Sequence, residues 1–136
     1  MKITLPARME SLQEATRFVL SHARAENLPG GRMTDIELGL EEALVNIFQY
    51  AYPEGGGEVE ISCRIDEGRK FIIEISDAGI PFDVLSVAEP DLSLALEDRQ
   101  IGGLGVLLIR KLMDDVTYRR ERNRNVLTLT VIKTPS

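Results

Sequence analysis

Residues 58–77 read EVEISCRIDEGRKFIIEISD, and this stretch decides the fold class. Its first half alternates polar and apolar side chains, which is typical of a strand with one buried face. The apolar members are Val59, Ile61, Cys63 and Ile65. Residues 66–68 are an Asp-Glu-Gly turn, and Phe71 to Asp77 is the next strand. Two strands joined by so short a turn predict an antiparallel hairpin.

Two amphipathic helices are expected before this hairpin. Residues 11–27 place apolar side chains at near-helical spacing, and the sequence Asn-Leu-Pro-Gly-Gly at 27–31 ends that helix. The second helix is expected to begin near Thr34, because Thr34 followed by Glu37 fits a capping box. Its apolar face consists of Ile36, Leu40, Ala43, Leu44, Ile47 and Ala51.

The remaining elements complete one sheet. Ile3 to Leu5 is a short edge strand that stops at a proline, and residues 104–113 form a short apolar helix. Val116 to Arg120 and Val126 to Ile132 predict a closing hairpin around Asn123-Arg124-Asn125. The order β-α-α-β-β-loop-α-β-β predicts an α+β fold, a two-layer α/β sandwich with a mostly antiparallel sheet and its helices on one face.

Composition narrows the class of protein. A chain of 136 residues is expected to be a single domain spanning 1–136. The net charge of -6 argues against binding to a nucleic-acid backbone, which needs clustered Lys and Arg. One cysteine excludes a disulfide framework, and no apolar run has the length of a signal peptide core or a membrane span. We therefore expect a cytoplasmic protein that binds no membrane.

Glu42 and Asn46 are the first candidate site. They are four residues apart and so project from the same side of the second helix, away from its apolar stripe. A carboxylate beside an amide oxygen can polarise a hydroxyl group and hold Mg²⁺. The alternative is a solvated helix face, the usual explanation of such a pair on its own.

Asp77-Ala78-Gly79-Ile80-Pro81 is the second candidate, at the end of a strand. An Asp there can accept a hydrogen bond from an exocyclic amine such as that of adenine, and the Gly lets the backbone approach a flat ring. The alternative is a plain turn, because Asp, Gly and Pro are common turn residues.

A glycine-rich turn is the third candidate. Residues 78–103 lack sustained periodicity and lead into Gly102-Gly103-Leu104-Gly105 at the start of the apolar helix. Free N–H groups at a helix N-terminus can cradle phosphates. A flexible hinge is the alternative, and neither the P-loop nor the dinucleotide fingerprint is matched.

The three candidates occur in an order that resembles the N, G1 and G2 boxes of the GHKL superfamily of ATP-binding domains. The likeness is greatest to the anti-sigma factor serine/threonine kinases, the RsbW-like group, in Glu42 to Asn46, Tyr52-Pro53, Asp77 to Asp83 and Gly103 to Gly105. It extends over nearly the whole chain, including the order of the elements.

The resemblance implies a role for each box. Asn46 would bind the Mg²⁺ that bridges the ATP phosphates, and Glu42 would be the general base toward a serine or threonine hydroxyl. Asp77 would accept from the adenine amine, with Gly79 beneath the base.

The phosphate end of the site would be formed by the glycine-rich turn, with Gly103, Leu104 and Gly105 lining the phosphates. Residues 78–102 would contain the ATP lid. Arg99 is a candidate phosphate contact, although a solvated loop charge is its more common explanation.

Two positions depart from the family pattern. Tyr50 stands where many relatives carry His. The last hairpin reads Arg124-Asn125-Val126 where relatives often have Gly-Thr near the adenine, so Asn125 could replace that hydroxyl.

The function implied is that of an ATP-dependent protein serine/threonine kinase and anti-sigma factor. It would phosphorylate a STAS-type antagonist in a partner-switching pathway of transcription regulation, with a sigma factor as second partner and a homodimer as the assembly that relatives suggest. The alternative is a non-catalytic ATP-binding module that regulates a partner by docking. A histidine-kinase ATP domain is disfavoured, because no helix with a phosphoacceptor His precedes the pattern.

Overall fold

The computed structural model describes residues 1–86 and 108–133, which form five strands, two long helices and three short helical segments. The sheet and the long helices, in chain order, are β1 (Lys2–Pro6), α1 (Leu12–Ala25), α2 (Gly30–Tyr50), β2 (Glu58–Asp66), β3 (Lys70–Asp77), β4 (Asp115–Glu121) and β5 (Arg124–Ile132). The short segments are the 3₁₀ turns η1 (Met9–Ser11) and η2 (Val84–Ser86) and a helical stretch at 108–112.

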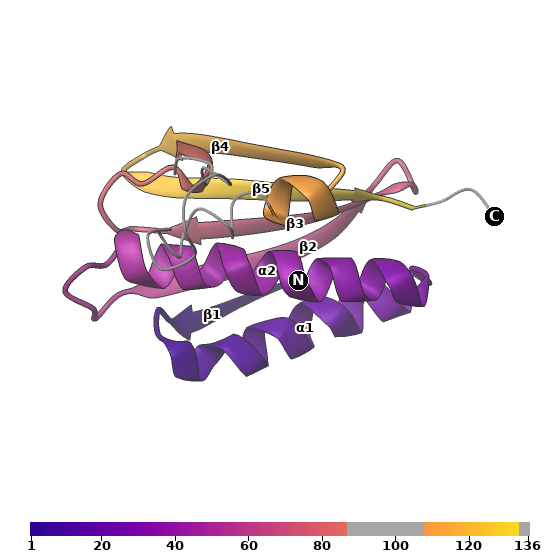
Figure 1. Cartoon of the computed structure of the whole chain (residues 1–136), viewed down its shortest axis with the longest axis horizontal. Helices are drawn as coiled ribbons and strands as arrows, with labels where there is room; N and C mark the ends of the chain where they lie inside the picture. The colour runs from indigo at the N-terminus through magenta and orange to yellow at the C-terminus, as the bar shows by residue number, and fades with distance from the viewer. Residues whose placement is uncertain (87–107, 134–136) are drawn as a thin grey trace, which may run out of the picture.

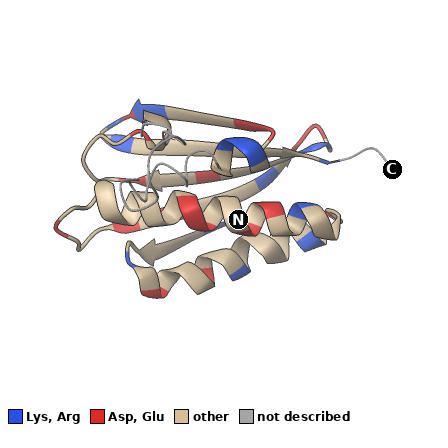
Figure 2. Cartoon of the chain, viewed as in Figure 1, with Lys and Arg blue, Asp and Glu red and all other residues tan. Residues whose placement is uncertain are grey.

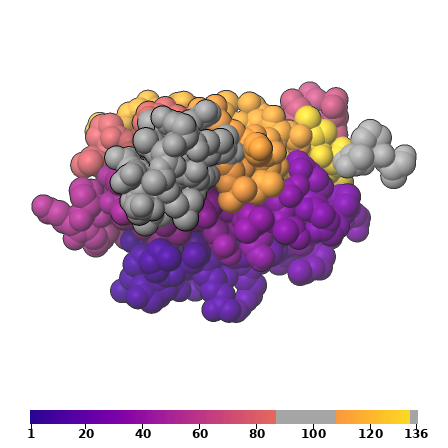
Figure 3. Space-filling view, viewed as in Figure 1, coloured from indigo at the N-terminus to yellow at the C-terminus, as the bar shows by residue number. Residues whose placement is uncertain are grey.

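The five strands form one sheet in the order β1-β2-β3-β5-β4, and every neighbouring pair is antiparallel. Helices α1 and α2 lie side by side on one face of it (Figure 1), and in the space-filling view the indigo and purple N-terminal third of the chain forms the lower part of this surface (Figure 3). The predicted two-layer α+β sandwich is therefore confirmed, and β1 is an edge strand as expected.

The core lies between this helical layer and the inner face of the sheet. Val59, Ile61 and Cys63 of β2 are buried while their neighbours along the strand are exposed or half-buried, as the alternation predicts. The whole predicted apolar face of α2 is buried as well. Among the described helices, none has the length and apolar character needed to cross a membrane.

Helix α2 begins four residues earlier than predicted. Pro29 is its N-cap, and the Met33 N–H already donates to the Pro29 carbonyl at 3.1 Å. Thr34 therefore lies inside the helix, and the predicted capping box is wrong. Arg32 ties this first turn to Asp35 and Asp114 at 2.7 and 2.6 Å, contacts that local spacing does not reveal.

The β4–β5 turn is also displaced from its predicted place. It consists of Arg122 and Asn123 alone, both with positive φ, of 52° and 62°. Positive φ at both central residues is the mark of a type I′ hairpin turn, which Asn tolerates well. Arg124 and Asn125 consequently belong to β5, not to the turn.

Several predictions lie outside the described residues. They concern Gly103, Leu104 and Gly105, the candidate phosphate contact Arg99, and the part of the expected lid beyond Ser86. Of the helix predicted at 104–113, the described part is helical at 108–112.

Candidate functional site

The elements that carry the described candidates Asn46, Asp77 and Asn125 come together at one end of the molecule. The C-terminal end of α2, the C-terminal end of β3 and the β4–β5 turn meet at the left of Figure 1. Basic residues collect at the tip of the β4–β5 hairpin, and α2 carries acidic ones (Figure 2). This end therefore combines a helix, a strand end and a hairpin tip.

Asp77 is a carboxylate at a position where the strand pattern calls for an apolar side chain. It follows Phe71, Ile73 and Ile75 on the inner face of β3 and is 1% exposed. Its Oδ1 accepts hydrogen bonds from the Gly79 N–H at 2.9 Å and from Asn125 Nδ2 at 2.8 Å. Within residues 1–86 and 108–133, Oδ2 accepts none, so it is the oxygen that could meet a ligand.

Burial raises the pKa of the Asp77 carboxyl above its ordinary value. The hydrogen bonds from Asn125 and the Gly79 N–H oppose this shift, and so do the charges of Arg120 and Arg124. Desolvation disfavours the ionised form of an acid, whereas donors and nearby cations favour it. Ionised Asp77 thus depends on these four groups.

Asn125 uses its whole hydrogen-bonding capacity within the protein. It is 3% exposed, and its Nδ2 donates to Asp77 Oδ1 and to the Ile80 carbonyl, both at 2.8 Å. Its Oδ1 accepts from the Phe82 N–H at 3.1 Å and from the Tyr118 hydroxyl at 2.6 Å. Two donor and two acceptor positions are all that an Asn side chain has. The expected contact of Asn125 with adenine stays a prediction, and such a contact would have to displace one of these partners.

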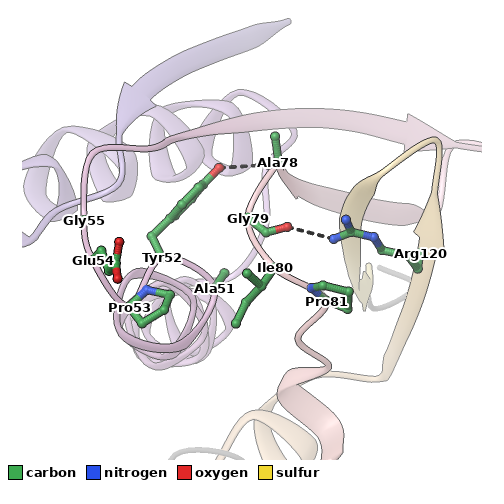
Figure 4. Close-up of a pocket in the computed structure, with 10 residues that line it drawn as sticks. All are labelled: Ala51, Tyr52, Pro53, Glu54, Gly55, Ala78, Gly79, Ile80, Pro81 and Arg120. Carbon is green, nitrogen blue, oxygen red and sulfur yellow. Dashed lines mark hydrogen bonds between the residues drawn. The ribbon is translucent and has the colours of Figure 1, made fainter.

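Gly79 is required by its closeness to α2. A Cβ at this position would lie 2.3 Å from the Ala51 carbonyl oxygen, and the Ile80 N–H donates to that same oxygen at 2.9 Å. The missing side chain therefore lets the loop after β3 dock on the end of α2. Arg120 donates to the Gly79 carbonyl at 2.9 Å from the other side (Figure 4).

A cleft of about 680 Å³ lies beside this loop, between residues 51–55, residues 78–81 and Arg120 (Figure 4). Tyr52 spans its inner side: its hydroxyl donates to the Glu58 carbonyl and accepts from the Ala78 N–H, both at 2.8 Å. Neither Glu42 nor Asn46 lines this cleft, so it is separate from the face that carries them.

Asn46 is buried, at 3% exposed, although the sequence placed it away from the apolar stripe. Its Nδ2 donates to the Glu42 carbonyl at 2.7 Å, which leaves Oδ1 without a donor among the described residues. Glu42 is half-buried one turn earlier, and Tyr50 one turn later is 39% exposed. The Tyr50 ring packs on Phe82 with centroids 5.2 Å apart.

Sequence reasoning did not single out Tyr118 or Arg120, and it placed Asn125 in a turn. Asp77 is directly opposite Asn125 in the β3–β5 register, and Asn125 is directly opposite Arg120 in the β4–β5 register. The signal was the strand period, since Asn125 precedes the buried Leu127, Leu129 and Val131 at steps of two.

Comparison with known proteins identifies the family of this chain. The family model for the histidine kinase-like ATPase domain matches residues 5–131. The serine-protein kinase RsbW of Bacillus thuringiensis (strain Al Hakam) is 29% identical over 130 residues, covering 93% of this chain and 81% of the relative. RsbW of Bacillus cereus (strain AH187) is similar to the same extent.

Two crystal structures share the fold. The structure of the RsbU and RsbW domains of a Mycobacterium tuberculosis protein matches with a TM-score of 0.66 at 14% identity. The match covers 100% of this chain and 33% of that one, so this chain spans about a third of it. A chain of the SiaB–SiaC complex from Pseudomonas aeruginosa matches with a TM-score of 0.64 at 17% identity, covering 97% and 88%. This protein therefore belongs to the histidine kinase-like ATPase domain family, with relatives among the RsbW serine-protein kinases.

Proposed function

We propose that this chain is an ATP-dependent protein serine/threonine kinase. The observation that carries the proposal is the buried Asp77, whose Oδ1 is saturated by protein donors while Oδ2 accepts from none of the described residues. A carboxylate oxygen left open in this way can accept a hydrogen bond, and the exocyclic amine of adenine is a suitable donor. The RsbW relatives, which are named serine-protein kinases, support the same reading.

The side-chain oxygens at this end suit a nucleotide with its metal ion. Asp77 would bind the adenine amine, with Gly79 beneath the base, and Asn46 would offer its amide oxygen to Mg²⁺. Magnesium is commonly held by one or two protein ligands together with substrate phosphates, where it neutralises charge on the phosphoryl group. Gly103, Leu104 and Gly105 are proposed to bind the phosphates through their N–H groups.

Glu42 is proposed as the general base. A substrate hydroxyl oxygen bonds to the γ-phosphorus, the bond from that phosphorus to the bridging oxygen breaks, and ADP leaves. Glu42 accepts the hydroxyl proton during this transfer. It lies one helical turn from Asn46, so the base and the metal ligand would share one side of α2.

The substrate is proposed to be a STAS-domain antagonist protein, and a sigma factor is proposed as the alternative partner in a cytoplasmic switch. Protein docking that depends on phosphorylation would then regulate transcription, and a homodimer is the proposed assembly. The similarity to RsbW, a serine-protein kinase, over 93% of this chain supports a protein as the substrate.

Substitutions on α2 test the assignment. Glu42→Ala is expected to lower phosphoryl transfer roughly a hundred- to ten-thousand-fold, the usual effect of removing a general base, while ATP binding persists. Asn46→Ala is expected to lose both phosphoryl transfer and ATP binding. The measurement is transfer of labelled γ-phosphate to a STAS-domain protein from the same genome, with calorimetric titration of ATP and Mg²⁺ alongside.

Glu37→Ala is the matched control, because Glu37 is a half-buried glutamate of the same helix with no assigned role. It should retain both activities. Phosphoryl transfer at the wild-type rate by Glu42→Ala would show that Glu42 is not the general base. ATP binding without transfer to any STAS partner would favour the alternative, a non-catalytic ATP-binding module that acts by docking.

A further inference from the structure

The base-reading carboxylate is held from the β4–β5 hairpin as well as from its own loop. Asn125 faces Asp77 directly across the β3–β5 ladder, and its Nδ2 lies 2.8 Å from Asp77 Oδ1. Gly79 supplies the second donor to the same oxygen. Both lone pairs of Oδ1 are thus used, so the carboxylate is fixed with Oδ2 as the remaining acceptor.

The amide orientation of Asn125 is forced by its partners. Nδ2 meets two acceptors, Asp77 Oδ1 and the Ile80 carbonyl, whereas Oδ1 meets the Phe82 N–H. Turning the amide over would set its oxygen against a carboxylate and a carbonyl, and its NH₂ group against an N–H donor. Only one orientation satisfies all three contacts.

Tyr118 holds this orientation from β4. Its hydroxyl is 2.6 Å from Asn125 Oδ1, to which it donates, and its ring packs against the hydrophobic core. The side chain is half-buried. The contact gives Asn125 its fourth hydrogen bond and links the loop after β3 to the outermost strand.

We propose that Asn125, oriented by Tyr118, is the positioning residue that sets the nucleobase specificity of this protein by presenting Asp77 Oδ2 to the exocyclic amine of adenine. This proposal rests on the nucleotide-binding function proposed above. Asn125 acts through Asp77 and needs no contact with the base, which agrees with its complete set of internal hydrogen bonds.

Asn125 also has an electrostatic effect on Asp77. Arg120 from β4, Arg124 from β5, the Gly79 N–H and Asn125 all favour the ionised carboxylate, against burial that raises its pKa. Burial raises the pKa of the Tyr118 hydroxyl, and so do the charges of Asp83 and Asp77. Removing Asn125 should raise the pKa of Asp77 further. The carboxylate would then become protonated at a higher pH, and its protonated oxygen could no longer accept a hydrogen bond from adenine.

The test compares ATP with inosine triphosphate, which carries a carbonyl where adenine has its amine. Calorimetric titrations with Mg²⁺ would be run on wild type, Asn125→Ala and Tyr118→Phe. The wild type should prefer ATP. Asn125→Ala should lower that preference about tenfold, the effect of losing one effective hydrogen bond, with the affinity for inosine triphosphate nearly unchanged. Tyr118→Phe should lower the preference for ATP by a smaller factor.

Two further measurements separate positioning from a merely structural role. The loss of ATP affinity on acidification should begin at a higher pH in Asn125→Ala than in wild type. Thr128→Val is the control, because Thr128 lies on the same strand and its Oγ1 has no hydrogen-bond partner among the described residues. It should keep the wild-type preference.

Each outcome decides between the proposals. Equal loss of both nucleotides, or an unchanged preference in Asn125→Ala, would overturn the positioning role while leaving the kinase proposal intact. Should Asn125→Ala fail to fold, an unchanged preference and pH profile in Tyr118→Phe would overturn it instead. A wild type that binds neither nucleotide would overturn both proposals.

Discussion

Asp77 is the residue at which this protein departs most clearly from the rules of a stable strand. It ends a row of inward-facing side chains on β3, and it is 1% exposed. An apolar residue there would avoid the cost of burying a charge. The hydrogen bonds from Gly79 and Asn125 offset that cost only partly, because the pKa of Asp77 remains raised. Residues selected for a site often carry such a cost in stability.

Asp77→Asn is therefore expected to stabilise the free protein at neutral pH. An acid with a raised pKa contributes stability below its unfolded pKa and loses that contribution as the pH rises through its folded value. The Asn side chain avoids this loss, and its oxygen can still accept from Gly79 and Asn125. Urea unfolding at neutral pH and near pH 4, about the ordinary pKa of an aspartate, measures the difference.

The advantage of Asp77→Asn should shrink in acid, since the wild-type carboxyl is then protonated too. The variant should also lose its preference for ATP. Lower stability than wild type at neutral pH would mean that the charges of Arg120 and Arg124 outweigh burial, contrary to the direction of the pKa shift.

At the scale of elements, the loop after β3 and the end of α2 form one joint. The Ile80 N–H bonds the Ala51 carbonyl, and Gly79 leaves no room for a Cβ beside it. The helix that carries Glu42 and Asn46 is in this way bonded to the loop that directly follows Asp77. The relative placement of the two halves of the site depends on that joint.

Gly79→Ala is expected to open the joint. Its Cβ would meet backbone at 2.3 Å, and backbone cannot rotate away as a flexible side chain can. Overpacking of this kind costs about 1–3 kcal/mol, and displacement of the loop should also weaken ATP binding. Urea unfolding and calorimetry measure the two effects.

Gly31→Ala is the matched control for that substitution. A Cβ at Gly31 meets nothing within 4 Å, and the residue lies in the first turn of α2. It should raise stability by about 0.5–1 kcal/mol, because Ala loses less backbone entropy than Gly. A Gly79→Ala variant as stable as wild type would show that the loop accommodates the Cβ without using this contact.

The elements also mark where sequence reasoning succeeds and where it stops. Burial along β2 and α2 follows from the period of the side chains alone, so both were predicted. The start of α2 was not, because Thr34 has good local capping chemistry but Arg32 holds an earlier turn through Asp114, far along the chain. Asn123 and Asn125 both suit a turn, and only pairing with β3 decides between them. The sequence identifies Asp77 and Gly79 as candidates, whereas the contacts of Asn125 follow from strand register. The roles of all three toward a nucleotide stay predictions.

The proposed nucleotide would lie between one helix and the sheet, so its binding should stabilise the molecule as a unit. The family model spans residues 5–131, and the two layers share one core. We expect a single thermal transition for this chain. ATP with Mg²⁺ at about a hundred times its Kd should add about 2.7 kcal/mol, a shift on the order of 10 °C.

Scanning calorimetry with and without ATP and Mg²⁺ checks this expectation. Asn46→Ala is the control variant, whose melting temperature should not change when the ligand is added. Two separate transitions would contradict the prediction of one domain over 1–136. An unshifted wild type would contradict nucleotide binding at any useful affinity.

The two-residue turn at Arg122 and Asn123 has a consequence for how this protein can change over generations. Residue types at the tip can vary among those that tolerate positive φ, since both side chains are exposed. Length cannot, because one inserted codon would shift β4 against β5 and turn alternate side chains to the opposite face. The hydrogen bond between Tyr118 and Asn125 would then be lost. Lineages that keep the same nucleotide preference should therefore vary at this tip by substitution and not by insertion or deletion.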